Sequence, residues 1–225
     1  DYSLRAAVED VLAFAAQLGG PAHLVGHDWG AVVAHLAAVR SPELFRSCSM
    51  LAIAPVKRLP AALLKVPEQL LRSGYMGFFQ LPLVPEWLLR RNGLAGVKWL
   101  GRRWSPGWDP ADHLDEAYRT LAQPGVLTAA LGWYRHLPRV WTGSNRQARS
   151  WLASPARVPT MVLLGMQDGC MSHRLIDDNI NLKDFPAGLR VEKIAGVGHF
   201  LHLEKPERIN DLLLAHLRQY SGDCN

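Results

Sequence analysis

Hydrophobic residues recur along the chain with two different periods, and these periods predict strands that alternate with helices. Short apolar runs typical of buried strands occupy residues 23–26, 47–54, 160–164 and 190–195. Apolar positions three and four residues apart predict helices at 3–18, 30–40, 172–183 and 206–220. Strands and helices in alternation favour a mostly parallel sheet covered on both faces, so the predicted fold class is α/β.

The pattern changes between residues 56 and 155. Helical runs there are short, and many prolines interrupt them: Pro60, Pro67, Pro82, Pro85, Pro106, Pro110, Pro124 and Pro138. One helix is expected to start at Asp109-Pro110 and to end at Gln123-Pro124-Gly125. Every tryptophan except Trp29 lies in this stretch. We therefore expect core segments at 1–55 and 156–225 and a helical cap at 56–155, whose tryptophans fill the cap interior or line a water-poor pocket.

The first predicted strand passes into the first long helix through Gly26-x-Asp28-x-Gly30. Small residues two positions either side of a central residue are typical of a sharp strand-to-helix elbow, where larger side chains are expected to collide. Such a turn holds the central side chain at the edge of the sheet and at the positive end of the helix. Asp28 is therefore a candidate nucleophile, although the same spacing also occurs in ordinary loops.

Aspartate in place of serine at this elbow changes the chemistry that is expected. A serine attacks an acyl carbon, whereas a carboxylate is better suited to displacing a leaving group from a saturated carbon. The substrate would then be an epoxide or an alkyl halide, and an alkyl ester of Asp28 would form.

Two further residues follow strands in the same way. Asp168 comes just after the predicted strand at 160–164, and His199 comes just after the strand at 190–195. In a parallel sheet these positions lie at one edge, beside Asp28. The order nucleophile, acid, histidine is the order used by α/β hydrolases. Each residue alone is more often structural, but three in matching positions favour a catalytic set.

These motifs resemble those of the α/β-hydrolase superfamily, and within it the epoxide hydrolases. Gly26-His27-Asp28-Trp29-Gly30 is similar to their nucleophile motif. Gly196-Val197-Gly198-His199-Phe200 with Glu204-Lys205-Pro206-Glu207 resembles their histidine loop and last helix. Tyr75-Met76-Gly77-Phe78-Phe79-Gln80 and Gly132-Trp133-Tyr134-Arg135 are similar to the two cap segments that carry the epoxide-activating tyrosines. The resemblance extends over essentially the whole chain.

The resemblance implies a role for each of these residues. Asp28 would attack the epoxide, Tyr75 and Tyr134 would hold and protonate its oxygen, and His199 with Asp168 would activate the hydrolytic water. The backbone amide of Trp29 would stabilise the oxyanion, and Phe79 would line the substrate site. A small apolar epoxide is the implied substrate. Haloalkane dehalogenases also have an aspartate elbow, so a dehalogenase-type hydrolase is the alternative enzyme, and packing is the alternative role of the tyrosines.

The resemblance also implies a difference from complete members of the family. They begin with several strands before the helix at 3–18, including a His-Gly-x-Pro loop that supplies an oxyanion-hole amide. The sequence contains no such loop, so we expect an α/β-hydrolase core that is truncated at its N-terminus. A truncated, non-catalytic hydrolase-like binding protein therefore remains an alternative: an upstream loop of this type would support an enzyme, and its absence would support the non-catalytic protein.

Charge and metal-ligand spacing add little to this interpretation. The net charge is +5. The basic residues Arg90, Arg91, Lys98, Arg102 and Arg103, interleaved with Trp99 and Trp104, are interpreted as a solvated cap face. Binding of nucleic acid or of an anionic membrane is the less favoured alternative. The pairs His23/His27 and His199/His202 lack a convincing carboxylate set. We expect no metal, no cofactor and no nucleic-acid partner.

Cysteine content and hydropathy bear on location. The cysteines, Cys48, Cys170 and Cys224, are odd in number and have no metal-like spacing, so we expect reduced thiols in a cytoplasmic protein. No apolar run approaches the roughly 18–20 residues of a membrane span. Stable membrane insertion is therefore not expected, and a homodimer stays open.

Overall fold

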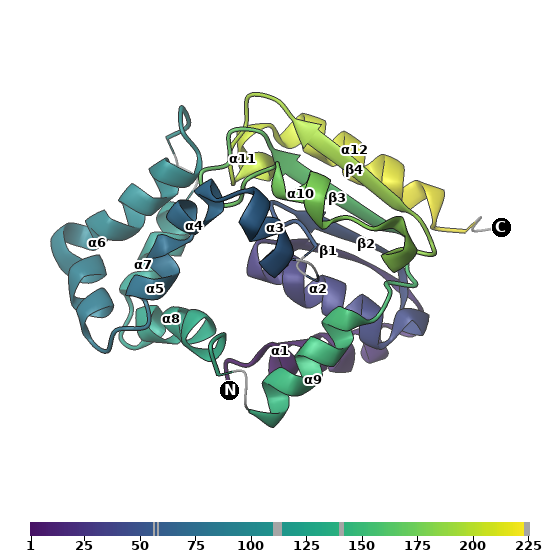
Figure 1. Ribbon diagram of the computed structural model, residues 1–225, viewed down its shortest axis with the longest axis horizontal. Coiled ribbons are helices and arrows are strands. Elements are labelled where there is room, and N and C mark those ends of the chain that lie inside the picture. The colour runs from purple at the N-terminus through teal and green to yellow at the C-terminus, as the bar shows by residue number, and fades with distance from the viewer. Residues whose placement is uncertain (56, 58, 110–113, 140–141, 223–225) are drawn as a thin grey trace.

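A parallel sheet forms the centre of the protein (Figure 1). The computed structural model describes residues 1–55, 57, 59–109, 114–139 and 142–222. Within them the sheet has the strand order β1-β2-β3-β4, with β1 at Ala22–His27, β2 at Phe45–Leu51, β3 at Thr160–Gly165 and β4 at Leu189–Ile194. All neighbouring strands run parallel, and one line of the register joins Gly26, Met50, Val162 and Val191. The predicted strands and the α/β class are confirmed.

Successive side chains of the inner strands point to opposite faces, and each face carries its own apolar cluster. Met50, Val162 and Leu164 belong to the larger cluster. This cluster lies under α1 (Leu4–Ala15), α2 (Trp29–Arg40) and α9 (Gly143–Ala153), with α3 (Leu59–Lys65) and α10 (Leu175–Asn179) at its edge. Leu51 and Leu163 face the other cluster, against α11 (Leu201–Glu204) and α12 (Pro206–Gln219). The sheet is thus covered on both faces, as the sequence predicts.

The remaining helices lie beside the core rather than on it (Figure 1), and we call them the α4–α8 layer. They are α4 (Glu68–Arg72), α5 (Gly74–Phe78), α6 (Val84–Trp104), α7 (Asp115–Ala122) and α8 (Val126–His136). This layer has an apolar cluster of its own, which includes Phe79, Leu89 and Tyr118. Two helices of the expected cap segment pack elsewhere: α3 contacts α10, and α9 contacts α1 and α2. The boundaries at residues 55 and 155 stay a prediction.

Helix α6 is interrupted in its middle. Arg91 is extended, and Asn92, Gly93 and Leu94 have left-handed backbone angles. After the break, Gly96 packs against Leu89, where a Cβ would come within 2.9 Å of a leucine methyl group. The element therefore consists of two helical segments that fold against each other.

Two expected helices differ in extent from the prediction. The helix expected at 172–183 is reduced to α10 and the 3₁₀ turn Leu182–Asp184, because Ile180 is extended and the Asn181 side chain accepts the Lys183 amide. The expected helix start at Pro110 lies outside the described residues, although α7 ends before Gln123 as expected. Other 3₁₀ turns occupy Ala16–Leu18 and Pro42–Leu44. None of the described helices is both long and apolar enough to cross a bilayer.

Candidate active site

Asp28 lies alone between the last residue of β1 and the first residue of α2. Its backbone angles, φ 52° and ψ −122°, fall in a region that residues with side chains seldom occupy. The Asp28 amide donates to the carbonyl of Leu51 at 3.1 Å, and its own carbonyl accepts from the amide of Ala31 at 2.9 Å. These bonds hold the strained turn at the C-terminal edge of the sheet, where the Asp28 side chain is 28% exposed.

The two glycines of the elbow are not equivalent. A Cβ at Gly26 would lie 2.2 Å from the carbonyl oxygen of Gly30, so only glycine fits there. At Gly30 a Cβ would meet nothing within 4 Å. The expectation that both glycines prevent a collision is therefore wrong for Gly30. The physical reason is direction: a side chain at Gly26 would enter the first turn of α2, whereas Gly30 is exposed.

Asp168 lies in the turn after β3 and is almost completely buried, with 1% of its side chain exposed. Its Oδ1 accepts the backbone amides of Cys170 at 2.6 Å and Met171 at 2.8 Å. Its Oδ2 lies 2.8 Å from Nδ1 of His199. The two amides fix the carboxylate, so its second oxygen is directed at the histidine.

His199 follows β4 and lies between the two aspartates. Its Nδ1 is directed to Asp168, and its Nε2 lies 3.6 Å from Oδ1 of Asp28. Burial opposes the charged ring and lowers its pKa, but the charge and hydrogen bond of Asp168, with Asp28 and Glu204, more than offset this. The net effect is a raised pKa. The sheet edge thus brings together the three residues that the sequence selects.

Two tyrosines from the α4–α8 layer lie over Asp28. Tyr75 comes from α5 and Tyr134 from α8, and their ring centroids are 5.8 Å apart. Burial is the main reason that both phenols have raised pKa values, and the negative charge of Asp28 raises both further. Both hydroxyls are therefore neutral proton donors near pH 7. The Tyr75 hydroxyl also lies 3.4 Å from Sγ of Cys170.

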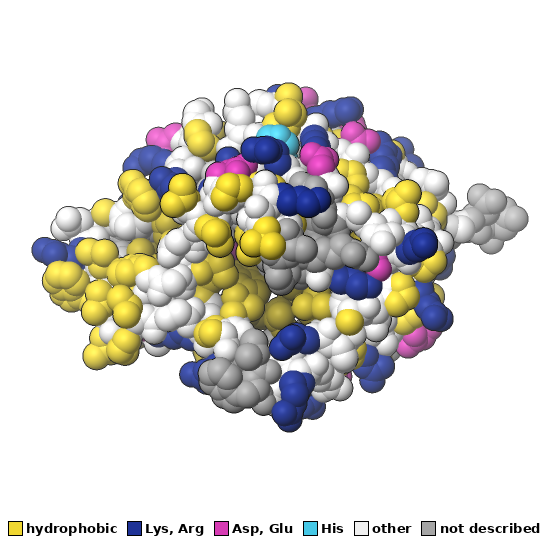
Figure 2. Space-filling model, in the orientation of Figure 1, with side chains coloured by type: hydrophobic (Ala, Val, Ile, Leu, Met, Phe, Trp, Pro, Cys, Tyr) yellow, Lys and Arg dark blue, Asp and Glu magenta, His cyan; other side chains and the backbone are white. Residues whose placement is uncertain are grey.

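Aromatic rings surround these tyrosines. Trp29 packs edge-on against Tyr134 at 5.4 Å, and Phe79 contacts Tyr75 at 5.3 Å and Tyr134 at 5.0 Å. Trp29 is the first residue of α2, so its amide has no acceptor within the helix. The ring centroid of Trp104 lies 5.3 Å from that of Tyr75, in a tilted contact, and 5.4 Å from that of His199, in an edge-on contact. Apolar side chains also line the hollow that Figure 2 shows near the middle of one face.

The end of α6 binds the loops that carry Asp168 and His199. The carbonyl oxygen of Trp104 accepts the amides of Gly169 at 2.9 Å and His199 at 3.1 Å. The next residue, Ser105, donates its hydroxyl to Glu204 at 2.7 Å and accepts the Phe200 amide at 3.1 Å. The loops that carry the acid and the histidine are therefore fixed to each other through the α4–α8 layer.

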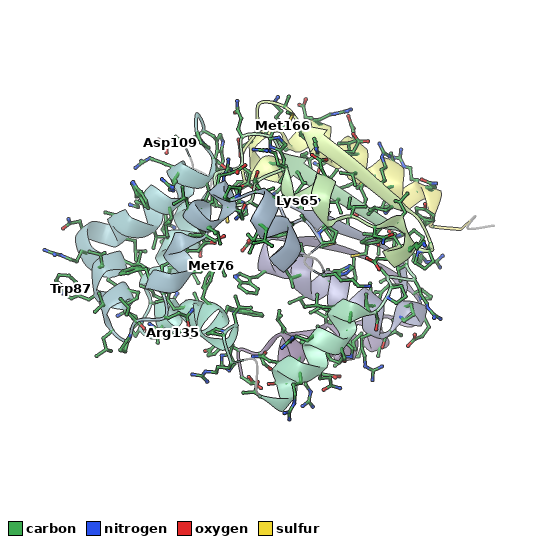
Figure 3. All side chains as sticks on the ribbon, in the orientation of Figure 1. Lys65, Met76, Trp87, Asp109, Arg135 and Met166 are labelled. Atoms are coloured by element: carbon green, nitrogen blue, oxygen red, sulfur yellow. The ribbon has the colours of Figure 1, made fainter. Side chains whose placement is uncertain are left out.

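Polar side chains also fix the rest of this layer. On α4, buried Gln69 donates to the Cys170 carbonyl and accepts the Ser172 amide, both at 2.8 Å. On α8, Arg135 pairs with Glu86 at 2.6 Å and donates to the Phe79 carbonyl at 2.9 Å. Arg135, labelled in Figure 3, thus ties the Tyr134 helix to the chain that follows the Tyr75 helix.

Three of the four histidines considered as metal ligands have hydrogen-bond partners in the protein: His199 pairs with Asp168, and His23 and His27 have partners of their own. His23 contacts the hydroxyls of Ser47 and Ser221. His27 lies 3.0 Å from the His199 carbonyl, and burial, with the nearby His199 and His202, lowers its pKa to about 3. His27 therefore stays neutral and supports the histidine loop. Among the described residues, one group of metal-ligand types comes together, and it is the unexpected set of Asp28, Cys170 and His199.

The basic face of α6 divides in the structure. Arg91 stacks on Trp87 at 4.5 Å and Arg103 on Trp99 at 5.5 Å, and both tryptophans are more than half exposed. Figure 3 shows Trp87 at the outer edge of the molecule. Trp104, which the sequence groups with this face, points to the candidate site instead. The interpretation as a solvated face stays a prediction for the others.

Sequence reasoning overlooked Cys170, Trp104 and Ser105 as site residues. Cys170 follows the acid by two positions, which is the available sequence signal. Trp104 and Ser105 lie far from any motif, and no local pattern indicates that their backbone and hydroxyl groups reach the loops.

Comparisons with known proteins agree with this fold. The alpha/beta hydrolase family model matches residues 1–212. The AB hydrolase superfamily protein YfhM of Bacillus subtilis is 32% identical over 197 residues, which are 87% of this chain and 65% of YfhM. Epoxide hydrolase 4 of Mus musculus is 25% identical over 97% of this chain and 60% of its own length. The chain thus spans less than two thirds of the length of these relatives.

Solved structures give the same result. A Bacillus megaterium epoxide hydrolase has a TM-score of 0.71 at 22% identity, covering 94% of this chain and 74% of that one. The Vigna radiata epoxide hydrolase VrEH1 has a TM-score of 0.77 at 23% identity, covering 97% and 75%. At these identities the similarity establishes a shared fold. Together with the family match over residues 1–212, it shows that this chain belongs to the alpha/beta hydrolase family.

Proposed function

We propose that the protein is an epoxide hydrolase that converts a small apolar epoxide to a vicinal diol. The observation that carries the proposal is the pair of neutral phenols, Tyr75 and Tyr134, beside the carboxylate of Asp28. An epoxide oxygen leaves readily when it receives hydrogen bonds or a proton as the ring opens, and two phenols supply both. The similarity to the mouse protein named Epoxide hydrolase 4 supports the same substrate class.

In the first step, a carboxylate oxygen of Asp28 attacks an epoxide carbon. The carbon–oxygen bond of the ring breaks, and a phenol of Tyr75 or Tyr134 donates a proton to the oxygen that is released. The product is an ester between Asp28 and the substrate. The α4–α8 layer acts as the cap that limits water during this step.

In the second step, Nε2 of His199 removes a proton from water, which attacks the carbonyl carbon of the Asp28 ester. Asp168 holds His199 in the tautomer with a free Nε2 and stabilises the imidazolium that forms. The backbone amide of Trp29, at the N-terminus of α2, stabilises the oxyanion. The bond between the ester carbonyl carbon and the substrate oxygen then breaks, and that oxygen takes the remaining proton of the added water, so that the diol and the Asp28 carboxylate are formed. The proton on His199 returns to the phenolate that the first step produced.

One observation favours a second candidate, dehalogenation of an alkyl halide by the same ester mechanism. The indole Nε1 of Trp104 is buried and has no hydrogen-bond partner among the described residues. Trp104 packs against Tyr75 and His199, so an indole N–H is near the site and a halide ion accepts such donors. Bromide release from an alkyl bromide, compared with diol formation from styrene oxide, decides between the candidates.

A single turnover in heavy-oxygen water with enzyme in excess tests the ester mechanism. One Asp28 oxygen leaves in the product, so the first diol should contain ordinary oxygen and the Asp28 peptide should carry the heavy label. Direct attack of water on the epoxide predicts a labelled diol and an unlabelled peptide. Mass spectrometry of both products distinguishes the two.

Replacing the nucleophile gives a second test. Asp28→Asn should remove turnover, because an amide is a weak nucleophile, whereas Asp211→Asn on the exposed side of α12 should keep it. A folded Asp28→Asn protein with normal turnover contradicts the proposal. A folded wild-type protein that binds epoxides without turnover supports the non-catalytic alternative.

A further inference from the structure

The candidate site contains a third type of side chain that the proposed reaction does not use. Cys170 lies two residues after Asp168 and is 5% exposed. Its Sγ, a carboxylate oxygen of Asp28 and a ring nitrogen of His199 all lie within 4.8 Å of one another. Sulfur, imidazole nitrogen and carboxylate oxygen are the three ligand types that zinc binds in proteins. The set therefore has the composition of a zinc site.

The geometry around His199 suits a metal ligand. Nδ1 lies 2.8 Å from Oδ2 of Asp168, and in the neutral tautomer that donates to this carboxylate Nε2 has its lone pair on the side of Asp28. A carboxylate behind the far nitrogen of a histidine is the common arrangement around protein-bound zinc, because it fixes the tautomer and raises ligand basicity. The bonds from Cys170 and Met171 hold that carboxylate in place.

The distances are also close to those required. Zinc bonds of about 2.0–2.3 Å in a tetrahedron separate the ligand atoms by about 3.3–3.7 Å. Nε2 of His199 and Oδ1 of Asp28 are already 3.6 Å apart. Zinc binding therefore requires the two most distant ligand atoms of the set to approach each other by about 1 Å. The hydroxyl of Tyr75 lies 3.4 Å from Sγ, which makes it the neighbouring oxygen to consider as a fourth ligand.

We propose that Asp28, Cys170 and His199 bind one zinc ion, with water or the Tyr75 hydroxyl as the fourth ligand. The Cys170 thiol releases its proton to solvent when the sulfur–zinc bond forms. The ion occupies the Asp28 carboxylate and Nε2 of His199, so it acts as a reversible inhibitor and not as a cofactor. The site is a property of these three side chains and does not depend on epoxide hydrolysis.

Cobalt(II) chloride is the probe, because a cobalt–thiolate bond gives an intense charge-transfer band in the near ultraviolet. All proteins carry Cys224→Ser, so that this thiol cannot contribute. We expect the band to saturate at an equimolar amount of cobalt, in the reference protein and in the matched control Cys48→Ala, whose cysteine is buried in β2. Cys170→Ser should abolish it, and zinc chloride should displace it.

Affinity measurements test the other ligands. Asp168→Asn should weaken zinc binding by roughly 10- to 100-fold, as loss of an outer partner does, and His199→Gln should weaken it further. Circular dichroism establishes that each variant is folded, and Cys170→Ala serves if Cys170→Ser is not. Absence of a band, or a band that persists in both folded Cys170 variants, overturns the proposal.

Inhibition of turnover by zinc is a separate test of the site. Where turnover is present, zinc should inhibit it and a chelator should restore it. Measured against its own metal-free rate, Cys170→Ser should lose a smaller fraction of its turnover to zinc than the reference protein does. Inhibition that is equal in both proteins contradicts the site. If the protein turns over neither epoxide nor halide, the cobalt spectrum still decides the metal proposal, so failure of the proposed function is distinguishable.

Discussion

Nδ1 of His199 lies 2.8 Å from Oδ2 of Asp168, and each of the two side chains is 1% exposed. A buried carboxylate in direct contact favours the protonated ring and, together with Asp28 and Glu204, outweighs the opposing effect of burial on the pKa of His199. The pair therefore fixes both the direction of the ring and the pH at which Nε2 becomes free to accept a proton.

We expect the rate of ester hydrolysis to fall as the pH drops through the pKa of His199. That pKa is raised above the usual value of 6.5, so the protonated ring, which cannot act as a base, persists to a higher pH than usual. Asp168→Asn removes the largest of the influences that raise the pKa of His199. In this variant the fall in rate on the acid side of the pH–rate profile should therefore move to lower pH. The control is Asp177→Asn, an exposed aspartate. If the acid-side fall in rate occurs at the same pH in Asp168→Asn, His199 paired with Asp168 is not the base of the second step.

Replacing the histidine should separate the two chemical steps. In His199→Gln, Asp28 can still attack the epoxide, but no base activates the water. Mass spectrometry after addition of epoxide should show the Asp28 peptide with the mass of the substrate added. A variant that binds substrate and forms no adduct argues against the covalent scheme.

The two phenols should each contribute to ring opening. Tyr75→Phe and Tyr134→Phe each remove one donor and should slow ester formation by about 100-fold or more. The double variant should be nearly inactive, because neither remaining ring can protonate the oxygen. Tyr118→Phe is a control, since Tyr118 lies in the apolar cluster of the α4–α8 layer. Full activity in both single variants would make the tyrosines packing residues and favour a dehalogenase.

The two elbow glycines should respond differently to alanine. Gly26→Ala places a methyl group 2.2 Å from a backbone oxygen and should lower the free energy of unfolding by about 1–3 kcal/mol or more. Gly30→Ala meets open space in a helix and should change it by less than about 1 kcal/mol, in the stabilising direction. Urea denaturation measures both. Equal free energies of unfolding in the two variants would mean that the backbone around Gly26 moves to accept the methyl group without loss of stability.

Local patterns predicted the part of the protein that depends on short stretches of sequence. The elbow at Asp28 has a fixed spacing, and the strand periods place Asp168 and His199 at the same edge of the sheet. These features follow from backbone geometry that is repeated in every parallel sheet. The positions of Tyr75 and Tyr134 came instead from a family resemblance, because no period of the chain indicates them.

Long-range contacts could not be predicted in this way. The left-handed break at Asn92–Leu94 turns α6 back on itself. The pair Asn92-Gly93 is a turn signal in the sequence, but it does not indicate which surfaces the two helical segments bring together. The bonds from Trp104 to Gly169 and His199 use a backbone carbonyl, which any residue possesses. For Cys170 the sequence shows only its distance from Asp168, and the sulfur faces the site because two amides bend the loop around that carboxylate.

The last turn of α6 restricts how the substrate preference of such a protein can be engineered by exchange of helices. The first segment of α6, before the break at Asn92–Leu94, belongs to the α4–α8 layer and could be replaced by the corresponding segment of a relative. The contact with the loops that carry Asp168 and His199 is made by Arg103, Trp104 and Ser105. A Cβ at Gly169 would collide with the carbonyl oxygen of Arg103, so these two segments of backbone pack directly against each other. A chimaera that exchanges helices of the α4–α8 layer therefore needs its downstream junction before residue 103. The donor then supplies the exchanged helices, and the host keeps its own contacts between residues 103–105 and the two loops.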